Sequence, residues 1–223
     1  MICLIFSQFI CLLNIMIKLF PFLFVLLWSS AFITTKPIID NSDPFAALAF
    51  RFAFVAFGFF LFSIYSKQKI LVNKRKFFES FFSGVLFHGF YLGGVFYSIS
   101  IGMPTAIAAL IVTLQPVLTN ALSGPVLNEK VSKKQWIGVL LGFAGAGLVL
   151  GFDVGSEIPA AGLIATVIAL LAITFSTLWQ KKLSNQLPLP VSNMNQALGG
   201  CLFHILIIIF FVDPYIYFSK TFI

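Results

Sequence analysis

The sequence predicts an all-α polytopic membrane protein with about seven transmembrane helices. Apolar residues make up 60% of its 223 residues and charged residues 9%, and the mean hydropathy is +1.04. These values lie far outside the range of soluble domains. Long apolar runs alternate with short polar gaps, and the basic residues are concentrated in every second gap. Because Lys/Arg-rich loops stay on the cytoplasmic side during insertion, this alternation indicates a chain threaded repeatedly through a bilayer.

The apolar runs are each long enough, at about 20 residues, to cross a bilayer. The seven predicted spans lie near 19–39, 45–65, 78–99, 104–126, 136–152, 159–179 and 193–212. Lys18 and the gaps at 66–77, 127–135 and 180–192 together hold eleven of the fourteen basic residues. The charge pattern therefore predicts a multi-pass protein of the cytoplasmic (inner) membrane whose N-terminus lies inside.

Residues 1–18 are expected to form an N-terminal extension and not a further span. The stretch is apolar, but Gln8 and Asn14 interrupt it. It has neither a basic n-region nor a small-residue cleavage site, so it does not fit a signal peptide. Met16 leads almost directly into the first span, and we hypothesise that translation naturally begins there. N-terminal sequencing of the native protein would contradict this hypothesis by finding Met1.

The segment 115–151 carries the most specific local pattern of the chain. Pro116 lies in mid-span, where it removes a backbone donor and is expected to kink the helix. Ser132 and Gln135 have the spacing of a helix-capping box. Glycines spaced four apart, which let two membrane helices approach closely, occur in the third and fifth spans. The glycines to which we assign a helix-packing role are Gly89, Gly93, Gly138 and Gly142.

Several of these features, in this order and spacing, resemble those of a known family. The residues concerned are the Leu26-Leu27-Trp28-Ser29-Ser30-Ala31-Phe32 segment, the Arg51-Phe52 pair, Pro116, Asn128-Glu129, Ser132, Gln135, Gly138, Gly142 and Gly145. Together they resemble the EamA-like repeat of the drug/metabolite transporter (DMT) superfamily over about 19–152. One departure is Asn128, because the family usually has glycine before the glutamate.

The resemblance implies a carrier built from two five-span repeats. An odd number of spans per repeat inverts the second copy, which is the usual basis of alternating access. The first EamA repeat is then expected at 19–152, and 153–223 is expected to be an incomplete second repeat with two spans. Three further spans are implied by the family. A fragment, a truncated or split gene, and completion by a second copy as a homodimer are the alternatives left open.

Polar side chains inside the spans are the candidates for a substrate site, because they are costly in hydrocarbon. Several share one helix face at a spacing of three or four residues, and from several helices they would converge on a central cavity. The predicted substrate-binding residues are Trp28, Ser30, Thr34, Arg51, His88, Tyr91, Gln115, Thr119 and Thr174. Each hydroxyl can instead bond its own helix. His88 can be a proton relay, or a neutral side chain satisfied by a neighbouring helix.

Arg51 is the one basic residue that lies away from the ends of the predicted spans. Two roles are open for it. Its long side chain could extend toward Asp43 at the outer interface, or it could hold a substrate carboxylate or phosphate.

Other functional classes find little support in the sequence. No span has a carboxylate at mid-depth, and there is no phosphate-binding glycine loop, paired catalytic carboxylates or metal-ligand spacing. We therefore expect no enzyme activity, no cofactor, no metal and no nucleic-acid partner. The expected function is secondary transport of small polar, amino-acid-like metabolites, mainly efflux, by alternating access. The alternatives are an inactive truncated carrier or accessory membrane fragment and, less favoured, an intramembrane enzyme that acts on a lipid-linked substrate.

Overall fold

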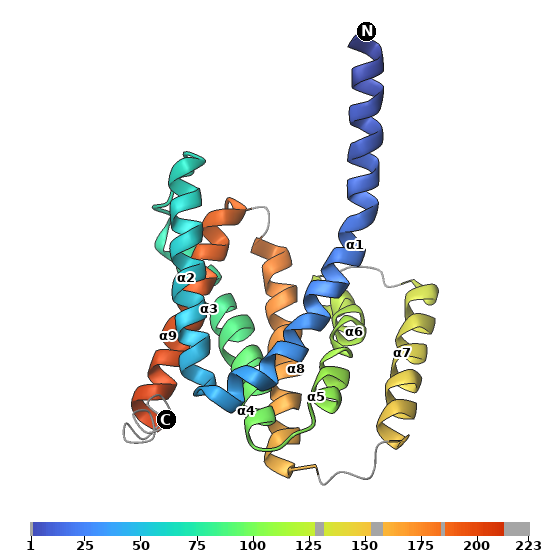
Figure 1. Cartoon of the computed structure of the whole chain (residues 1–223), viewed down its shortest axis with the longest axis vertical. Coiled ribbons are helices and arrows are strands. Elements are labelled where there is room, and N and C mark those ends of the chain that lie inside the picture. The colour runs from blue at the N-terminus through green and yellow to red at the C-terminus, as the bar shows by residue number, and fades with distance from the viewer. Residues whose placement is uncertain (1, 128–131, 153–157, 184–185, 212–223) are drawn as a thin grey trace.

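The computed structural model of the chain describes residues 2–127, 132–152, 158–183 and 186–211. Within these ranges the chain forms helices and contains no strand. The helices stand side by side as a bundle, and the N-terminal part of the first helix projects beyond it (Figure 1). The Asn128-Glu129 pair and the segment after residue 211 lie outside the described residues.

The helices agree closely with the predicted spans. In chain order the elements are α1 (Ile2–Asn41), α2 (Pro44–Tyr65), α3 (Lys74–Gly84), the π-helix η1 (Val85–Leu92), α4 (Gly93–Ser100), α5 (Thr105–Val112), α6 (Gln115–Leu127), α7 (Lys133–Phe152), α8 (Ala160–Leu183) and α9 (Leu189–Phe211). The six described segments that are long and apolar enough to cross a membrane are Phe22–Asn41, Pro44–Tyr65, Lys74–Ser100, Thr105–Leu127, Ala160–Leu183 and Leu189–Phe211. The 20-residue helix α7 coincides with the predicted fifth span. The prediction of an all-α polytopic membrane protein with about seven spans is therefore confirmed.

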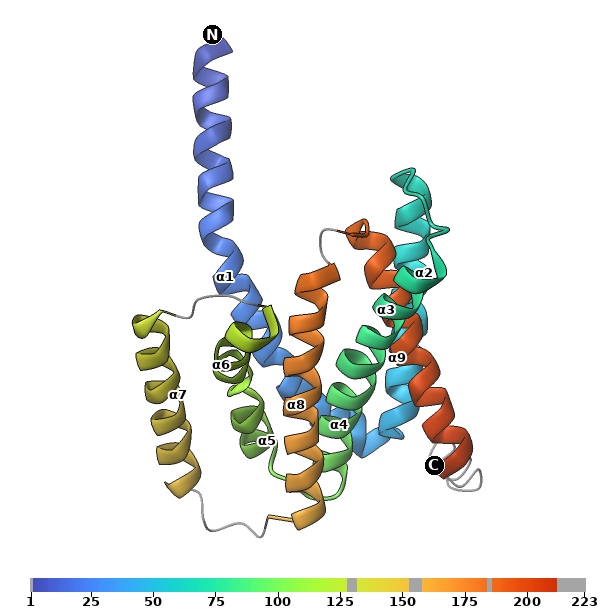
Figure 2. The same ribbon diagram turned by 180° about the vertical axis from the view of Figure 1, so that it is seen from behind.

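The first helix extends further toward the N-terminus than its span. It is continuous over 40 residues, and its candidate span begins at Phe22. Residues 2–21 continue the same helix away from the bundle, as the view from behind also shows (Figure 2). A translation start at Met16 would leave the candidate span whole, and it stays a prediction.

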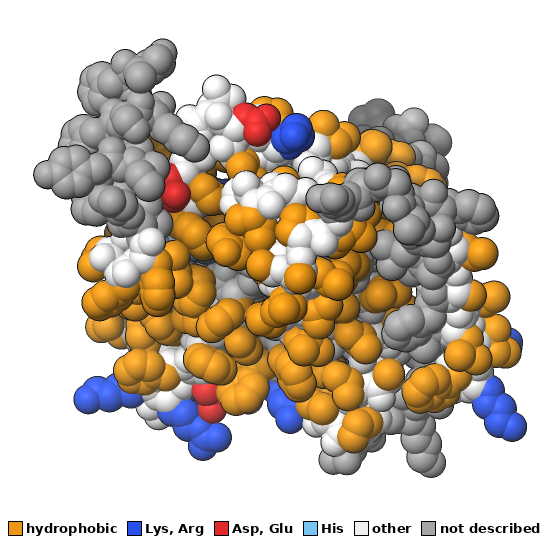
Figure 3. Space-filling view, turned by 90° about the horizontal axis from the view of Figure 1, so that it is seen from below, with side chains coloured by type: hydrophobic (Ala, Val, Ile, Leu, Met, Phe, Trp, Pro, Cys, Tyr) orange, Lys and Arg blue, Asp and Glu red, His pale blue; other side chains and the backbone are white. Residues whose placement is uncertain are grey.

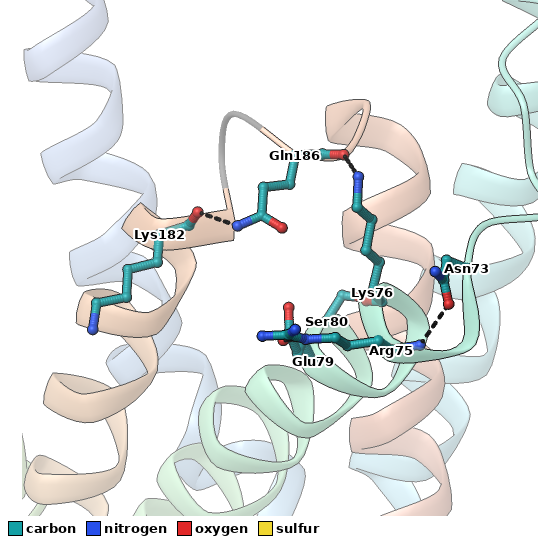
Figure 4. A network of polar contacts seen from close by, with 7 residues as sticks. All are labelled: Asn73, Arg75, Lys76, Glu79, Ser80, Lys182 and Gln186. Atoms are coloured by element: carbon teal, nitrogen blue, oxygen red, sulfur yellow. Dashed lines mark hydrogen bonds and ion pairs between the residues drawn. The ribbon is translucent and has the colours of Figure 1, made fainter.

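The start of α3, the end of α8 and the segment before α9 meet at one end of the bundle (Figure 4). Lys76 donates from Nζ to the carbonyl oxygen of Gln186 over 3.1 Å, and the side-chain amide of Gln186 donates to the carbonyl oxygen of Lys182 over 3.1 Å. On α3, Arg75 Nε and Glu79 Oε1 form an ion pair at 2.8 Å. The basic residues of these two connections therefore lie at the same end, as the alternating charge pattern requires.

Local sequence signals explain where several helices begin. Asp43 is the N-cap of α2, and its Oδ1 accepts from the backbone amides of Phe45 and Ala46 at 2.9 Å each. The amide of Ser132 donates to the Gln135 side chain over 2.7 Å, and the amide of Gln135 donates to Ser132 Oγ over 3.3 Å. The predicted capping box is therefore confirmed, and such a cap contributes about 1 kcal/mol to helix stability.

Two spans contain interruptions of the regular α-helix. The fourth span breaks between Val112, where α5 ends, and Gln115, where α6 begins. Pro116 is the second residue of α6, and its missing amide leaves the carbonyl group of residue 112 without an intrahelical partner. The third span is continuous, but its middle is the eight-residue π-helix η1. Segments of π-helix are rare and occur frequently at functional sites.

Helix α9 packs against α2, α3 and η1. It meets α3 at glycines that bring the two backbones into contact. A Cβ atom on Gly84 would overlap the backbone of Gln196, and one on Gly199 would overlap the carbonyl oxygen of Phe81. Neither glycine belongs to the predicted packing set. This contact fixes α9 against the third span.

The four predicted packing glycines have different surroundings. A Cβ on Gly89 would lie 2.7 Å from Phe203 Cγ, and one on Gly93 would lie 2.9 Å from a ring carbon of His204. A Cβ on Gly142 would lie 3.1 Å from Val117 Cγ2. No described atom lies within 4 Å of the corresponding position on Gly138. Close packing is thus found for the pair in the third span and, more loosely, at Gly142.

Buried polar side chains join the third span to α8 and α9. Ser83 Oγ and Ser176 Oγ lie 3.1 Å apart, and Ser176 Oγ donates to the Ser83 carbonyl oxygen over 2.9 Å. Asn195 Nδ2 donates to Ser80 Oγ over 3.0 Å. All four residues are buried. Such bonds are worth about 0.6–2 kcal/mol each between membrane helices.

The outer surface of the bundle is largely apolar. Figure 3 views the bundle from below, and even at this end hydrophobic side chains cover most of the described surface, with Lys and Arg side chains at its margin. Large apolar side chains are exposed on α1, α2, α7, α8 and α9. This surface suits a hydrocarbon environment, which needs no polar outer shell.

The glycine contact between α3 and α9 gives a direct test of the packing. We expect Gly199→Ala to destabilise the protein by about 1–3 kcal/mol, because the added methyl group overlaps the Phe81 carbonyl oxygen and the backbone cannot yield easily. Gly58→Ala in α2 is the matched control, because no described atom lies within 4 Å of its Cβ position. Thermal unfolding in detergent measures both changes. Equal melting temperatures for the two variants would contradict the contact.

Candidate functional site

A cavity of about 240 Å³ lies among α1, α2, η1 and α4. Its lining includes four of the predicted substrate-binding residues, which come from three different spans. These four are Trp28, Arg51, His88 and Tyr91. The cavity therefore brings together residues that lie up to 63 positions apart in the sequence.

Aromatic side chains form the walls of this cavity. The rings of Trp28 and Tyr91 stack with centroids 6.4 Å apart and planes 8° apart. Phe87 meets Tyr91 edge-on at 5.5 Å, and Phe52 lies 4.4 Å from the ring of His88. Such ring pairs hold one another in place through their quadrupoles as well as through burial. The walls are therefore flat, apolar and firmly positioned.

Arg51 is the cation of the cavity lining. Its guanidinium carbon lies 5.8 Å from the centroid of the Phe52 ring. In the part of the chain that the structure describes, the ion-pair partners do not include Arg51. Asp43, toward which it could extend, is engaged in the N-cap of α2. The guanidinium group thus keeps its five donors available for a ligand.

The hydroxyl groups predicted in the first span lie elsewhere. Ser30 and Thr34 are exposed and bond their own helix, with Ser30 Oγ donating to the carbonyl oxygen of Leu27 over 2.8 Å and Thr34 Oγ1 to that of Ser30 over 3.0 Å. The hydroxyl-bearing residue of α1 that lines the cavity is the buried Thr35. Thr35 follows Trp28 by seven positions, which places both on one helix face.

A second cavity of about 460 Å³ lies among α6, α8 and α9, and Thr119, Gln180, Lys181, Asn193 and Gln196 contribute to its lining. It is more polar than the first, because hydroxyl, amide and ammonium groups face it. It lies near the end of α8 and the start of α9, and therefore near the basic end of the bundle.

Gln115 connects the helices that border the second cavity. Its amide nitrogen lies 3.2 Å from Thr119 Oγ1 and 3.1 Å from Thr177 Oγ1, so it joins α6 to α8. The predicted residue Thr174 is fully buried one turn away on α8, and its hydroxyl donates to the carbonyl oxygen of Leu170 over 2.7 Å. The structure therefore separates the predicted residues into a group at the first cavity, a group near the second, and residues that bond only their own helix.

One buried polar residue beside the first cavity was not predicted. His204 of α9 is fully buried, and its Nε2 lies 2.9 Å from the carbonyl oxygen of His88. Its ring lies 6.0 Å from the rings of both Phe45 and Phe52. The sequence did contain a signal for His204, because the chain has two histidines and both lie within predicted spans, where polar side chains are candidates for function.

The described residues contain no group of three or more His, Cys, Asp or Glu side chains that could hold a metal ion.

Comparison with known proteins identifies the family of the chain. Residues 15–151 match the EamA-like transporter family. The chain is 25% identical over 169 residues to a protein of Salmonella typhimurium (strain LT2) named "Probable amino-acid metabolite efflux pump", and the matched region covers 75% of this chain and 54% of that protein. The chain thus spans about half the length of this curated relative. No solved structure matches. Because the family match covers more than half of the chain, the protein belongs to the EamA-like transporter family.

Proposed function

We propose that the protein acts as a secondary transporter that exports small polar, amino-acid-like metabolites. Membership of the EamA-like transporter family supports transport as the general activity, and members of this family are generally not enzymes. The observation that carries the proposal is the position of Arg51, an unpaired cation in an aromatic cavity built from three spans. The relative named as an amino-acid metabolite efflux pump supports the cargo class and the direction.

The cavity chemistry suits a small molecule with an anionic group. A guanidinium fork binds a carboxylate through two parallel hydrogen bonds. The faces of Trp28 and Tyr91 would receive an apolar side chain or an ammonium group of the same molecule. A volume of about 240 Å³ is smaller than the roughly 300–1,000 Å³ of drug-sized ligand pockets, which favours a metabolite the size of an amino acid.

Charge placement supports the proposed orientation in the cytoplasmic membrane. The basic ends of α3 and α8 meet at one end of the bundle, and such ends stay in the cytoplasm. The N-terminus would then be cytoplasmic as well. In this orientation the second cavity faces the cytoplasm, and we assign it the role of a vestibule through which cargo enters before export.

Alternating access is the mechanism that the family architecture favours. In it, an inverted pair of repeats rocks around a fixed central site. We assign 19–152 to the first repeat and 153–223 to part of the second, which further chain or a second copy would complete. The break at Gln115 and the π-helix η1 supply two positions at which spans can bend.

Transport in a purified system tests the proposal. The protein is reconstituted into liposomes loaded with unlabelled amino acids, and entry of each labelled amino acid by exchange is measured. Exchange of at least one such metabolite above protein-free liposomes is the expected result. A protein that unfolds cooperatively in detergent yet exchanges none of a broad panel of amino acids and related metabolites would overturn the proposal.

Arg51→Ala should weaken binding of the transported metabolite by about tenfold or more, because a charge-assisted hydrogen bond contributes about 1.5–3 kcal/mol. Arg51→Lys keeps the charge but not the fork, and should restore part of the affinity. Arg75→Ala is the control, because Arg75 is exposed on α3 and pairs with Glu79 away from the cavity. Ligand-induced thermal stabilisation and exchange measure the effect. An unchanged affinity in Arg51→Ala would exclude the proposed contact.

Trp28 should report cargo binding by its fluorescence. It is one of three tryptophans, and it lines the first cavity, whereas Trp136 and Trp179 are exposed and do not. Cargo that stacks on its indole ring should change the emission of the wild type, and the change should disappear in Trp28→Phe. Trp136→Phe should keep it. A signal that survives in Trp28→Phe would place the cargo elsewhere.

A further inference from the structure

The two histidines of the chain interlock with two glycines across the contact between the third span and α9. The Cβ atom of His88 occupies the space that a side chain on Gly200 would fill. In the reverse direction, a Cβ on Gly93 would lie 2.9 Å from Cε1 of His204. Each helix thus offers one histidine and one glycine to the other, and we call this arrangement the His–Gly interlock.

A hydrogen bond fixes which ring nitrogen of His204 carries a hydrogen. Its Nε2 lies 2.9 Å from the carbonyl oxygen of His88, and a carbonyl oxygen only accepts. Nε2 therefore carries a hydrogen and donates it. Nδ1 is buried and has no hydrogen-bond partner in the described chain. In the ordinary neutral imidazole this atom is a bare acceptor, so the interlock as described holds His204 neutral.

The surroundings of His204 offer no charge to balance a second proton. The rings of Phe45 and Phe52 on α2 lie 6.0 Å away. The titratable and charged side chains on the elements packed around it are Arg51 and Tyr65 on α2, Lys74, Arg75, Lys76 and Glu79 on α3, His88 and Tyr91 on η1, Tyr97 on α4 and Cys201 on α9 itself. The one carboxylate among them, Glu79, is paired with Arg75 on α3, and Arg51 is a cation. A protonated His204 would be a buried, unpaired charge, which is strongly unfavourable.

The interlock also borders the first cavity. The side chain of His88 lines the cavity, while its backbone oxygen holds His204 and its Cβ faces Gly200. It lies within the π-helix η1, a segment whose backbone is already irregular. A change in the interlock therefore changes the cavity wall.

We propose that His204 is the proton-binding site of the carrier, and that protonation of its Nδ1 releases the His–Gly interlock and so couples proton entry to cargo export. This proposal rests on the proposed transport function. The neutral arrangement keeps the cavity wall formed and holds cargo. Protonation favours a second arrangement in which Nδ1–H reaches water or an acceptor and the wall is opened. Loss of the proton on the cytoplasmic side lets the interlock form again, so one proton moves inward as cargo moves outward.

Substitution by glutamine separates the two functions of His204. His204→Gln keeps an N–H donor for the His88 carbonyl oxygen but cannot bind a proton in this pH range. The kept donor should preserve cooperative thermal unfolding in detergent, but exchange should fall severalfold even without a pH gradient, because a side chain that binds no proton cannot release the interlock. Accumulation of cargo driven by a pH gradient should be lost; in the wild type, one proton per cargo molecule and one pH unit can sustain a concentration ratio of about ten.

Asn195→Ala is the matched control. Asn195 is also buried on α9 and also bonds the third span, through Ser80, but it does not titrate. This variant should lose thermal stability while keeping its response to the pH gradient. Gradient-driven accumulation by His204→Gln at the wild-type level would overturn the proposal. So would net movement of cargo by the wild type without opposite movement of protons, measured with a pH-sensitive dye inside liposomes that contain no cargo, and this second test does not depend on any variant folding.

A stability measurement distinguishes failure of this inference from failure of the transport proposal. Absence of any exchange by the wild type would contradict transport alone. The proton site is then tested by the melting temperature in detergent between about pH 7.5 and 5.5, where histidines titrate. Because the folded state holds His204 neutral while the unfolded chain binds a proton, acid should lower the melting temperature. The fall should be smaller in His204→Gln, and an equal fall in both proteins would overturn the proton site.

Discussion

Backbone contact between α3 and α9 is the constraint on which the arrangement of this bundle depends. Lipid gives membrane helices no hydrophobic reason to associate, so close approach through small residues must supply the attraction. Gly84 and Gly199 provide it, because each lies directly against backbone atoms of the opposite helix. The same crossing leads α9 along η1, where His204 meets the His88 carbonyl oxygen. The position of the candidate site therefore follows from a contact that contains no site residue.

The polar side chains inside the bundle divide according to whether they have partners. Ser83 and Ser176 satisfy one another, as do Ser80 and Asn195, and these pairs stabilise the packing of three spans. Arg51 belongs to the other class, because it lines a cavity and has no ion pair among the described residues. Arg51 is exposed, and an unpaired cation within a membrane span is costly. A ligand with a carboxylate or phosphate group is the natural source of compensation.

Local signals in the sequence were enough to predict the spans and the capping box at Ser132, because both depend on residues close together in the chain. The faces of the helices were harder to predict. Thr35 and not Thr34 lines the first cavity, since which face of α1 turns inward depends on helices distant in sequence. Gly199 was not predicted either, because its partner on α3 is a backbone carbonyl group and the four-residue glycine pattern describes one helix alone. Contacts between spans can be predicted only when the three-dimensional arrangement of the helices is known.

His88 combines in one residue three features that a coupled carrier needs. Its ring forms part of the cavity wall, its carbonyl oxygen accepts the hydrogen of His204, and its Cβ fills the space left by Gly200. Coupling between two sites requires an element with two arrangements whose balance both ligands influence. A regular α-helix would resist local movement, whereas the π-helix around His88 has already departed from the regular hydrogen-bond pattern. A proton at His204 and cargo in the cavity would thus act on the same short segment of backbone from opposite sides.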